Sequence, residues 1–313
     1  MKNFDTLQGI LSAQRQFGET LNQFDKDDEG KLELTKTLLL SLHNEVGQLT
    51  SSINYRHHVN DRFVNRSKML FESVDIIRYV AAILNTWSFD HHQLSKAMEL
   101  RNTHLRIRQE ISNKKWNGEP VVVVDVDDVI ADFRTRFYEW LESRGVKTDL
   151  EGKEYYNTDA IVRAGIDPNT VFEDFISQGG MMELQPVQWL LDEIQALKDS
   201  GHWIQILTAR PQENPMCEYA TYAWLESWGV DVDAIGFSPE KYRWLTQQEY
   251  FLKGKVKFAL DDSPKHALEY STHGIRVLAP LKTYNEQLID VKNIDVYRNQ
   301  EEFSKAINNL EVK

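Results

Sequence analysis

The sequence contains very little cysteine: Cys217 is alone among 313 residues. A single cysteine forms no disulfide within the chain, which points to a reducing compartment. The sequence also has no apolar run of the roughly 18 residues that a membrane-spanning helix needs. Its first thirty residues contain Asp5, Asp25 and Asp27 and no long apolar core, so we expect no secretion signal. These absences predict a cytoplasmic protein without a membrane partner.

Positive charge is also scarce. The chain has 36 Lys and Arg residues against 48 Asp and Glu residues, which gives a net charge of −12. Proteins that bind long nucleic acids neutralise the phosphates with Lys and Arg, so this balance argues against such a partner. Nucleotides remain open as small-molecule partners, because a bound metal ion can neutralise their phosphates.

Proline is missing from residues 1–112, where apolar residues such as Leu38 and Leu42 recur at helical spacing. We therefore expect an all-α helical bundle over residues 1–113. Its four or five helices should lie at roughly 4–24, 31–55, 63–87 and 90–112. The polar segment 114–120, which contains a glycine and a proline, interrupts this pattern and is the expected linker.

Residues 121–313 show another pattern, in which short apolar runs alternate with helical segments. Such alternation is typical of a doubly wound α/β domain with a parallel sheet. The stretch of about residues 134–185 is too long for a simple crossover between strands and is rich in aromatic residues. We expect it to form a small helical cap that closes over a site and selects the substrate.

Three of the apolar runs end in polar side chains: Asp125 and Asp127, then Thr208, then Asp261 and Asp262. In open α/β sheets, ligands bind just beyond the carboxyl ends of the strands. Clustered carboxylates repel one another unless a cation or a change of protonation relieves them. The pattern therefore predicts a site at this edge, although the first segment alone could be only an acidic turn.

Asp-x-Asp, Thr and Asp-Asp, in this order at strand ends, resemble the haloacid dehalogenase superfamily over about residues 119–313. That superfamily consists mostly of phosphatases that work through an aspartyl-phosphate. The resemblance implies that Asp125 is the nucleophile and that Asp127 acts as general acid and then as base. It also implies Mg²⁺ held by Asp125, by the backbone carbonyl of Asp127, and by Asp261 or Asp262.

The second strand end is expected to bind the phosphoryl group. Thr208 and the backbone amide of Ala209 would donate hydrogen bonds to its oxygens. Arg210 has two alternative interpretations, as a substrate contact or as a salt-bridge partner of Asp261 or Asp262.

A lysine is needed to offset the charge of the nucleophile and the phosphate. We predict Lys241, because it lies about twenty residues before Asp261 at an expected helix start, as the lysine of this superfamily does. Lys253 is the alternative. Asp128, next to the acidic pair, is expected to cap the following helix.

The helical half carries its own acidic pattern, Glu45-x-x-Gln48 and Glu72-x-x-Asp75. It resembles the MazG-like and dimeric-dUTPase group of all-α nucleoside triphosphate pyrophosphohydrolases. Those proteins hold Mg²⁺ with Glu-x-x-Glu and Glu-x-x-Asp on adjacent helices. The segment 101–108 looks like their nucleotide-contacting helix. Because MazG-like domains usually form dimers or tetramers, the resemblance also implies a homo-oligomer.

Gln48 departs from that pattern. A neutral amide replaces a charged ligand, whereas Mg²⁺ prefers hard anionic oxygen. Three interpretations of the helical half stay open: it hydrolyses nucleoside triphosphates, binds them without hydrolysis, or serves only as a dimerisation bundle. The acidic residues can also be partly exposed helix residues without a ligand.

Three functions are compatible with these patterns. The first is an Mg²⁺-dependent phosphatase acting on nucleoside monophosphates, similar to 5′(3′)-deoxyribonucleotidases. The second is a polynucleotide 3′-phosphatase, since residues 185–280 look like the phosphatase half of bacteriophage polynucleotide kinase. The third is a nucleotide-binding regulatory or oligomerisation protein with an inactive helical domain.

Overall fold

The computed structural model describes residues 6–21, 23, 27–53, 64–156 and 158–311. The chain forms two compact units, Met1–Glu99 and Leu100–Lys313. The division falls inside helix α4 (His91–Asn113), upstream of the segment 114–120 that we expected to be the linker. Within the described residues, no helix is both long enough and apolar enough to cross a bilayer.

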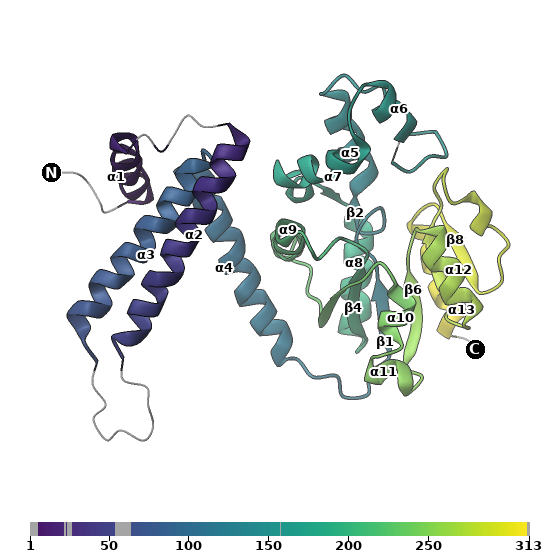
Figure 1. The fold of residues 1–313 in the computed structure, drawn as a ribbon. Coiled ribbons are helices and arrows are strands. Elements are labelled where there is room, and N and C mark those ends of the chain that lie inside the picture. Colours follow the sequence, from purple (N-terminus) through teal and green to yellow (C-terminus); the bar gives the residue numbers. More distant parts are fainter. Residues whose placement is uncertain (1–5, 22, 24–26, 54–63, 157, 312–313) are drawn as a thin grey trace. The chain divides into compact units, whose positions relative to one another are not determined.

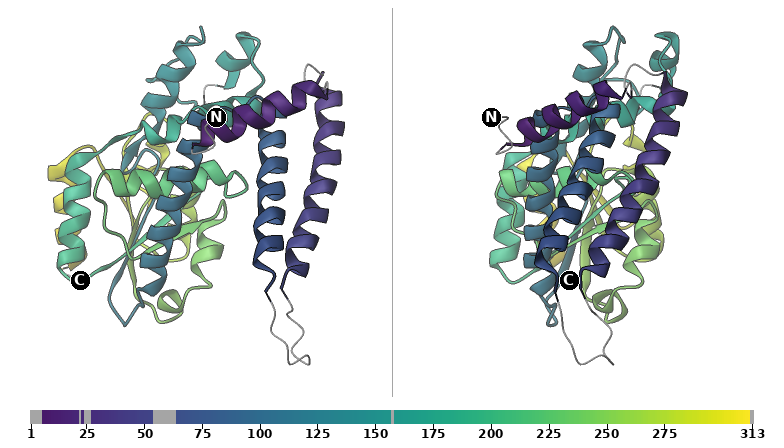
Figure 2. Two further views of the ribbon diagram at one scale, coloured as in Figure 1. Left: turned by 90° about the vertical axis from the view of Figure 1, so that its left-hand side faces the viewer. Right: turned by 60° about the vertical axis from the view of Figure 1, so that its left-hand side comes forward.

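The first unit is helical, as predicted (Figure 1). It contains α1 (Leu7–Thr20), α2 (Asp28–Ser51), α3 (Arg66–Thr86) and the first part of α4. The first three helices are each preceded by an N-cap residue: Thr6, Asp27 and Asn65. The side chain of each N-cap accepts a hydrogen bond from a backbone amide of the first turn. Helices α2 and α3 run side by side, and α1 packs on α3 (Figure 2).

The second unit is built on a six-stranded parallel sheet, which confirms the predicted doubly wound α/β class. Its strands are β1 (Val121–Val124), β4 (Trp203–Thr208), β5 (Ala234–Phe237), β6 (Val256–Leu260), β7 (Val277–Pro280) and β8 (Ile294–Tyr297). All four valines of β1 are buried, because helices cover both faces of the sheet.

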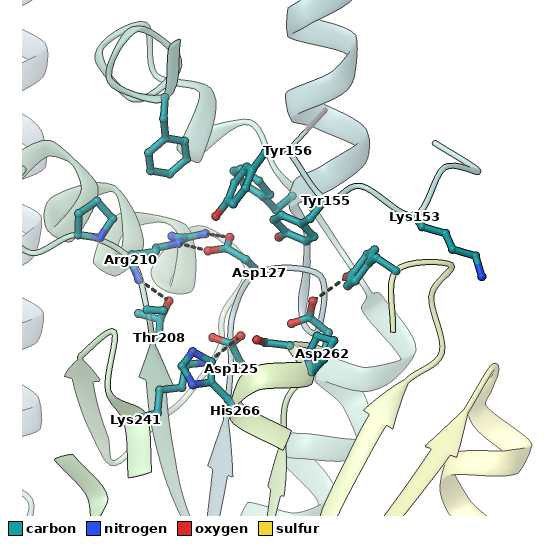
Figure 3. Close-up of a pocket in the computed structure, with 17 residues that line it drawn as sticks. Asp125, Asp127, Lys153, Tyr155, Tyr156, Thr208, Arg210, Lys241, Asp262 and His266 are labelled. Atoms are coloured by element: carbon teal, nitrogen blue, oxygen red, sulfur yellow. Dashed lines mark hydrogen bonds and ion pairs between the residues drawn. The ribbon is translucent and has the colours of Figure 1, made fainter. Parts of the chain in front are cut away.

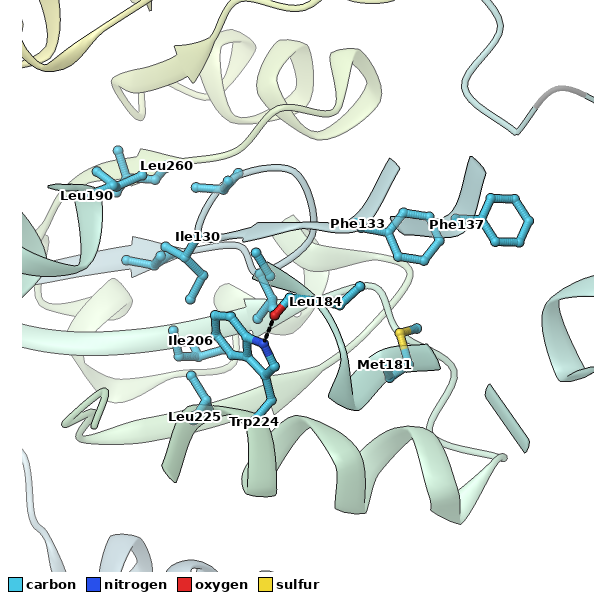
Figure 4. Packing of buried hydrophobic residues seen from close by; sticks show 14 of the residues in the cluster. Ile130, Phe133, Phe137, Met181, Leu184, Leu190, Ile206, Trp224, Leu225 and Leu260 are labelled. Carbon is cyan, nitrogen blue, oxygen red and sulfur yellow. Dashed lines mark hydrogen bonds between the residues drawn. The ribbon is translucent and has the colours of Figure 1, made fainter. Parts of the chain in front are cut away.

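The helices divide between the two faces of the sheet. Buried side chains of α8 (Gln188–Asp199), α9 (Pro215–Ser227) and α13 (Gln300–Glu311) share one hydrophobic core with one face of β1. Figure 4 shows Leu190, Trp224, Leu225 and Ile206 in this core. The opposite face packs on α10 (Lys241–Leu245), α11 (Glu249–Leu252) and α12 (Pro264–Thr272).

The strand order β5-β4-β1-β6-β7-β8 determines where a ligand can bind. The chain moves from β1 outwards to β4 and β5, and then returns to the other side of β1 to form β6. Doubly wound sheets bind ligands at such a reversal, outside the carboxyl ends of the strands. Val124 pairs with both Ile206 and Leu260, so β1, β4 and β6 deliver their following residues to one place.

A small helical cap is inserted after β1. It begins and ends in a two-stranded antiparallel sheet, β2 (Ala131–Asp132) with β3 (Gln185–Pro186). Between these strands lie α5 (Phe133–Glu142), α6 (Thr158–Arg163), α7 (Pro168–Ser177) and the short 3-10 helix η1 (Gly180–Met182). Aromatic rings fill the cap interior, among them Phe133, Phe137, Trp140 and Phe175.

Candidate active site

Asp125 is the first residue after β1, and its position follows from the sheet. Its backbone amide donates a 2.9 Å hydrogen bond to Leu260, the last residue of β6. Its carboxylate is buried, with Oδ2 at 2.8 Å from Lys241 Nζ. Oδ1 is buried and has no hydrogen-bond partner in the described part of the chain. The residue thus presents one paired and one unpaired oxygen at the switch point.

Lys241 begins α10 and is fully buried. Its ammonium group bridges two carboxylates, at 2.8 Å from Asp125 Oδ2 and 2.7 Å from Asp261 Oδ2. Burial alone lowers the pKa of Lys241, but these two negative charges outweigh it and raise the pKa. Lys253, the alternative, is exposed and pairs with Glu249. The structure therefore brings Lys241, and not Lys253, to the candidate nucleophile.

Asp261 and Asp262 follow β6 and complete an acidic cluster. Oxygens of Asp125, Asp261 and Asp262 lie within 4.8 Å of one another, and all three residues are buried. Asp262 is held in place by Tyr284, whose hydroxyl donates a 2.6 Å hydrogen bond to Oδ2. Lys241 pairs with two of these three carboxyl groups, so a single positive charge faces a cluster of three acids.

The electrostatic cost of this cluster shows in its pKa values. Burial, with the charges of Asp261 and Asp127, raises the pKa of Asp125 to about 7 despite the opposing effect of Lys241. Burial and the neighbouring carboxylates also raise the pKa of Asp262 well above its usual range. A cation among these oxygens would remove the penalty.

Asp127 also lines the pocket and is paired with Arg210 (Figure 3). Arg210 Nε donates to Asp127 Oδ2 at 2.9 Å, and Nη2 donates to Oδ1 at 2.6 Å. We had considered Asp261 or Asp262 as the salt-bridge partner of Arg210. The structure shows Asp127 instead, because Asp261 is already engaged by Lys241 and Asp262 by Tyr284.

The pocket between these groups has a volume of about 390 Å³. Its floor includes Asp125, Lys241, Thr208 and Ala209, and Arg210 and Asp127 line it as well. The cap supplies four aromatic side chains to the lining, here called the roof: Phe133, Tyr155, Tyr156 and Phe172. Figure 3 shows Tyr155 and Tyr156 among them. All the residues predicted for the C-terminal site therefore lie together, except that Asp261 lies just beneath the lining, behind Lys241.

Several lining residues were not singled out from the sequence, including Lys153, Tyr284 and His266. Tyr284 follows β7 and His266 lies in the first turns of α12, so neither stands next to a motif. Asp128 was expected to cap the next helix, but the N-cap of α5 is Asp132, whose side chain accepts a hydrogen bond from a backbone amide of the first turn. Asp128 Oδ1 accepts a 3.0 Å hydrogen bond from the backbone amide of Arg134 in the same turn.

The predicted N-terminal site is only partly assembled. Glu45 on α2 approaches Glu72 and Asp75 on α3, with oxygens within 4.8 Å of one another. Desolvation and the two neighbouring acids raise the pKa of Glu45. Gln48 lies one turn further along α2 and is half-buried. Asp75 also pairs with Arg78, at 3.3 Å.

The segment 101–108 belongs to the second unit and is engaged there. Arg101 donates to the Tyr219 hydroxyl at 2.7 Å, and His104 Nε2 lies 3.0 Å from a Glu218 carboxylate oxygen. His104 is fully buried, with its ring against Tyr219 and Tyr222 of α9. This differs from the expected nucleotide-contacting helix, because aromatic packing on α9 occupies these side chains.

No protein-family model matches the sequence, and no curated protein matches it. Solved structures do resemble it. A HAD family hydrolase from Deinococcus radiodurans R1, with bound phosphate and sodium, is 13% identical, with TM-score 0.44 over 62% of this chain and 97% of that one. A predicted phosphoglycolate phosphatase from Haemophilus somnus 129pt is 13% identical, with TM-score 0.42 over 62% and 100%. A putative HAD-hydrolase from Bacillus subtilis bound to magnesium is 17% identical, with TM-score 0.42 over 61% and 100%.

Proposed function

We propose that the second unit is an Mg²⁺-dependent phosphatase that hydrolyses nucleoside monophosphates through an aspartyl-phosphate on Asp125. The arrangement of Asp125 carries this proposal. It lies at the switch point of the sheet, shares Lys241 with Asp261, and keeps one buried oxygen without a partner. Asp127 lines the same pocket and is the candidate proton donor to the leaving group.

The residues present fit a magnesium ion. Mg²⁺ takes oxygen ligands at about 2.0–2.1 Å in octahedral geometry and prefers anionic ones. Asp125, Asp261 and Asp262 offer three such oxygens within 4.8 Å of one another, and the unpartnered Oδ1 of Asp125 is an available ligand atom. When bound, the ion would neutralise charge on the phosphoryl oxygens.

The first chemical step would transfer the phosphoryl group to the protein. Oδ of Asp125 forms a bond to phosphorus as the bond from phosphorus to the leaving oxygen breaks. Asp127, as a carboxylic acid, gives its proton to that leaving oxygen, so the nucleoside departs as an alcohol. Lys241 offsets the negative charge of Asp125 and the phosphate throughout.

The second step would release phosphate. Asp127, now a carboxylate, takes a proton from water as the water oxygen forms a bond to phosphorus and the acyl-phosphate bond breaks. Asp125 returns as a carboxylate and Asp127 as an acid, so protons balance over the cycle. The Thr208 hydroxyl accepts a 3.3 Å hydrogen bond from the Arg210 amide, which leaves its own proton for a phosphoryl oxygen.

The roof of the pocket supports a nucleoside as leaving group. Tyr155, Tyr156 and Phe172 offer aromatic faces, on which bases stack. The volume of about 390 Å³ falls within the roughly 300–1,000 Å³ of small-molecule sites. A polynucleotide 3′ end is the alternative substrate, and it would have to pass the cap.

Phosphate release from a panel of nucleotides and from a 3′-phosphorylated oligonucleotide tests this function. We expect release from mononucleotides that needs added Mg²⁺ and that Asp125→Asn reduces by at least about 10³-fold. Asp192→Asn, at an exposed position of α8, is the control and should keep full activity. Equal release by wild type and Asp125→Asn would remove the assignment, and release from the oligonucleotide alone would favour the alternative.

We also propose that the first unit binds a nucleoside triphosphate with Mg²⁺ through Glu45, Glu72 and Asp75. The support is the convergence of these carboxylates from two helices.

Gln48 argues for binding without hydrolysis, since an amide supplies no anionic ligand. Calorimetry should show that nucleoside triphosphates bind only with Mg²⁺ and that Glu72→Gln removes this binding. Wild type should form no pyrophosphate, whereas Gln48→Glu should form it. If wild type already forms pyrophosphate, the unit is a hydrolase; if it binds nothing, it is only an oligomerisation bundle.

A further inference from the structure

Each of the three nitrogens of the Arg210 guanidinium donates a hydrogen bond to a neighbour within the protein. Two of its nitrogens, Nε and Nη2, bind the two oxygens of Asp127 at 2.9 and 2.6 Å. The third, Nη1, donates to the Thr221 hydroxyl at 2.8 Å. The side chain is 1% exposed. Three of the five N–H groups of Arg210, at least one on every nitrogen, are therefore used to hold Asp127 and Thr221, although the residue also lines the pocket.

The two buried cations, Lys241 and Arg210, pair with different carboxylates of the site. Lys241 serves Asp125 and Asp261, the side of the nucleophile. Arg210 serves Asp127, the side of the proton donor. Lysine is a point charge that can bridge two acids, whereas the planar arginine fork matches a single carboxylate in two hydrogen bonds.

We infer that Arg210 is a positioning residue, which fixes the direction of the Asp127 carboxylate, and not a ligand of the substrate phosphate. The inference rests on the proposed function, in which Asp127 exchanges a proton with the leaving oxygen and with water. A fork with two bonds fixes the carboxylate plane, while each carboxylate oxygen keeps a second lone pair. The Asp127 side chain remains 21% exposed and lines the pocket, so a proton can still be exchanged there.

Helix α9 sets the direction of Arg210 in turn. Thr221 is fully buried, and its hydroxyl donates to the Cys217 carbonyl at 2.8 Å while it accepts from Arg210. The hydroxyl is therefore locked between one donor and one acceptor. Thr221 thus acts on Asp127 through Arg210, without contact with the pocket.

Steady-state and rapid-quench kinetics of Arg210→Ala and Arg210→Lys on a mononucleotide test the inference. We expect kcat to fall about 10²- to 10³-fold, as for a lost general acid–base, with KM within about threefold of wild type. Rapid quench should show slower formation and slower hydrolysis of the phosphoenzyme, because Asp127 is the acid in the first step and the base in the second. Added guanidinium ion should raise the activity of Arg210→Ala at least about tenfold. It should not raise the activity of Arg243→Ala, a control variant on the surface of α10.

Thr221→Val is the milder variant, which keeps the shape of the side chain and the charge of Arg210. It should lower kcat by about tenfold with KM unchanged. A rise of KM of more than about tenfold with kcat retained, in any of the three variants, would show a phosphate ligand and overturn the inference. So would unchanged kinetics in an active protein. If wild type itself releases no phosphate, the proposed function fails and the inference with it.

Discussion

At the scale of single residues, the site is a problem of charge. Asp125, Asp261 and Asp262 are buried together with one lysine, and such an arrangement is stable only when each charge finds a partner. Lys241 is the partner that the protein itself supplies, and its place between Asp125 and Asp261 makes it irreplaceable by the exposed lysines nearby.

Replacing Lys241 tests this place. We expect Lys241→Met to lower kcat by about 10³-fold or more, because nothing else offsets the charge of Asp125 during phosphoryl transfer. Lys253→Met removes an exposed lysine that pairs with Glu249 and should leave activity within about twofold. Activity assays on both variants decide between the two lysines. Equal losses would contradict the assignment.

The raised pKa of Asp125 predicts how stability depends on pH without metal. Its pKa is about 7 in the folded protein and about 4 in the unfolded chain. Between these values the folded state holds a proton that the unfolded state has lost, so stability falls as pH rises from about 4 to about 7. Urea unfolding of metal-free protein at pH 5 and pH 7 should show this fall, on the order of 2 kcal/mol.

The control for the pH experiment is Asp125→Asn, which removes the titrating group. Its stability should change less between pH 5 and pH 7 than that of wild type. Added Mg²⁺ should stabilise wild type more at pH 7 than at pH 5, since the ion binds the ionised cluster. A steeper fall in Asp125→Asn than in wild type would contradict the prediction.

At the scale of elements, the packing of the cap and of α4 can be tested by changing single residues or the length of the chain. Gly180 in η1 lies against Phe175, and a Cβ there would approach the ring to 2.2 Å. Gly180→Ala should therefore lower the free energy of unfolding by about 1–3 kcal/mol through overpacking. Calorimetry measures the change. Gly201→Ala is a poor control because of its positive φ, whereas Gly47→Ala meets open space in α2 and should cost nothing.

The second part of α4 is an element of the α/β unit. Leu100 and His104 are buried, and Ile111 packs against the core around α9. A chain shortened to residues 100–313 should keep a melting temperature several degrees above that of residues 114–313, since the shorter chain exposes the α9 aromatics. Thermal unfolding followed by circular dichroism compares the two. Equal melting temperatures would place the boundary at the predicted linker.

At the scale of the whole molecule, the first unit leaves many large apolar side chains exposed and buries few. Among its described residues, only four apolar side chains before Glu99 are buried: Leu11, Leu38, Ala81 and Ala82. Large apolar side chains stay exposed on α2 and α3, including Leu32, Leu39, Leu40, Val46, Leu70, Phe71, Val74 and Ile77. Exposed apolar side chains in this number on two neighbouring helices would suit a protein–protein interface if they form one patch.

We therefore keep the prediction of a homo-oligomer formed through the helical unit. On α2, Leu32, Leu39 and Val46 recur every seven residues, which aligns them along one side of the helix. Leu39→Glu with Val46→Glu should shift the mass in light scattering towards the monomer and leave helicity unchanged. Exchanging two exposed glutamates of the same helix, Glu29 and Glu33, for glutamine is the control. A monomeric wild type would refute the prediction.

Local patterns in the sequence predicted the α/β class, the cap and the meeting of Asp125, Thr208 and Asp261. These depend on local patterns, because buried parallel strands deliver their carboxyl ends to one edge of the sheet. Only the tertiary structure shows which charged side chains pair with one another. Lys241 rather than Lys253 reaches Asp125, and Arg210 turns to Asp127, because these contacts join loops that are far apart in sequence. The same reason explains α4, whose second part belongs with α9 although its sequence continues the helical half.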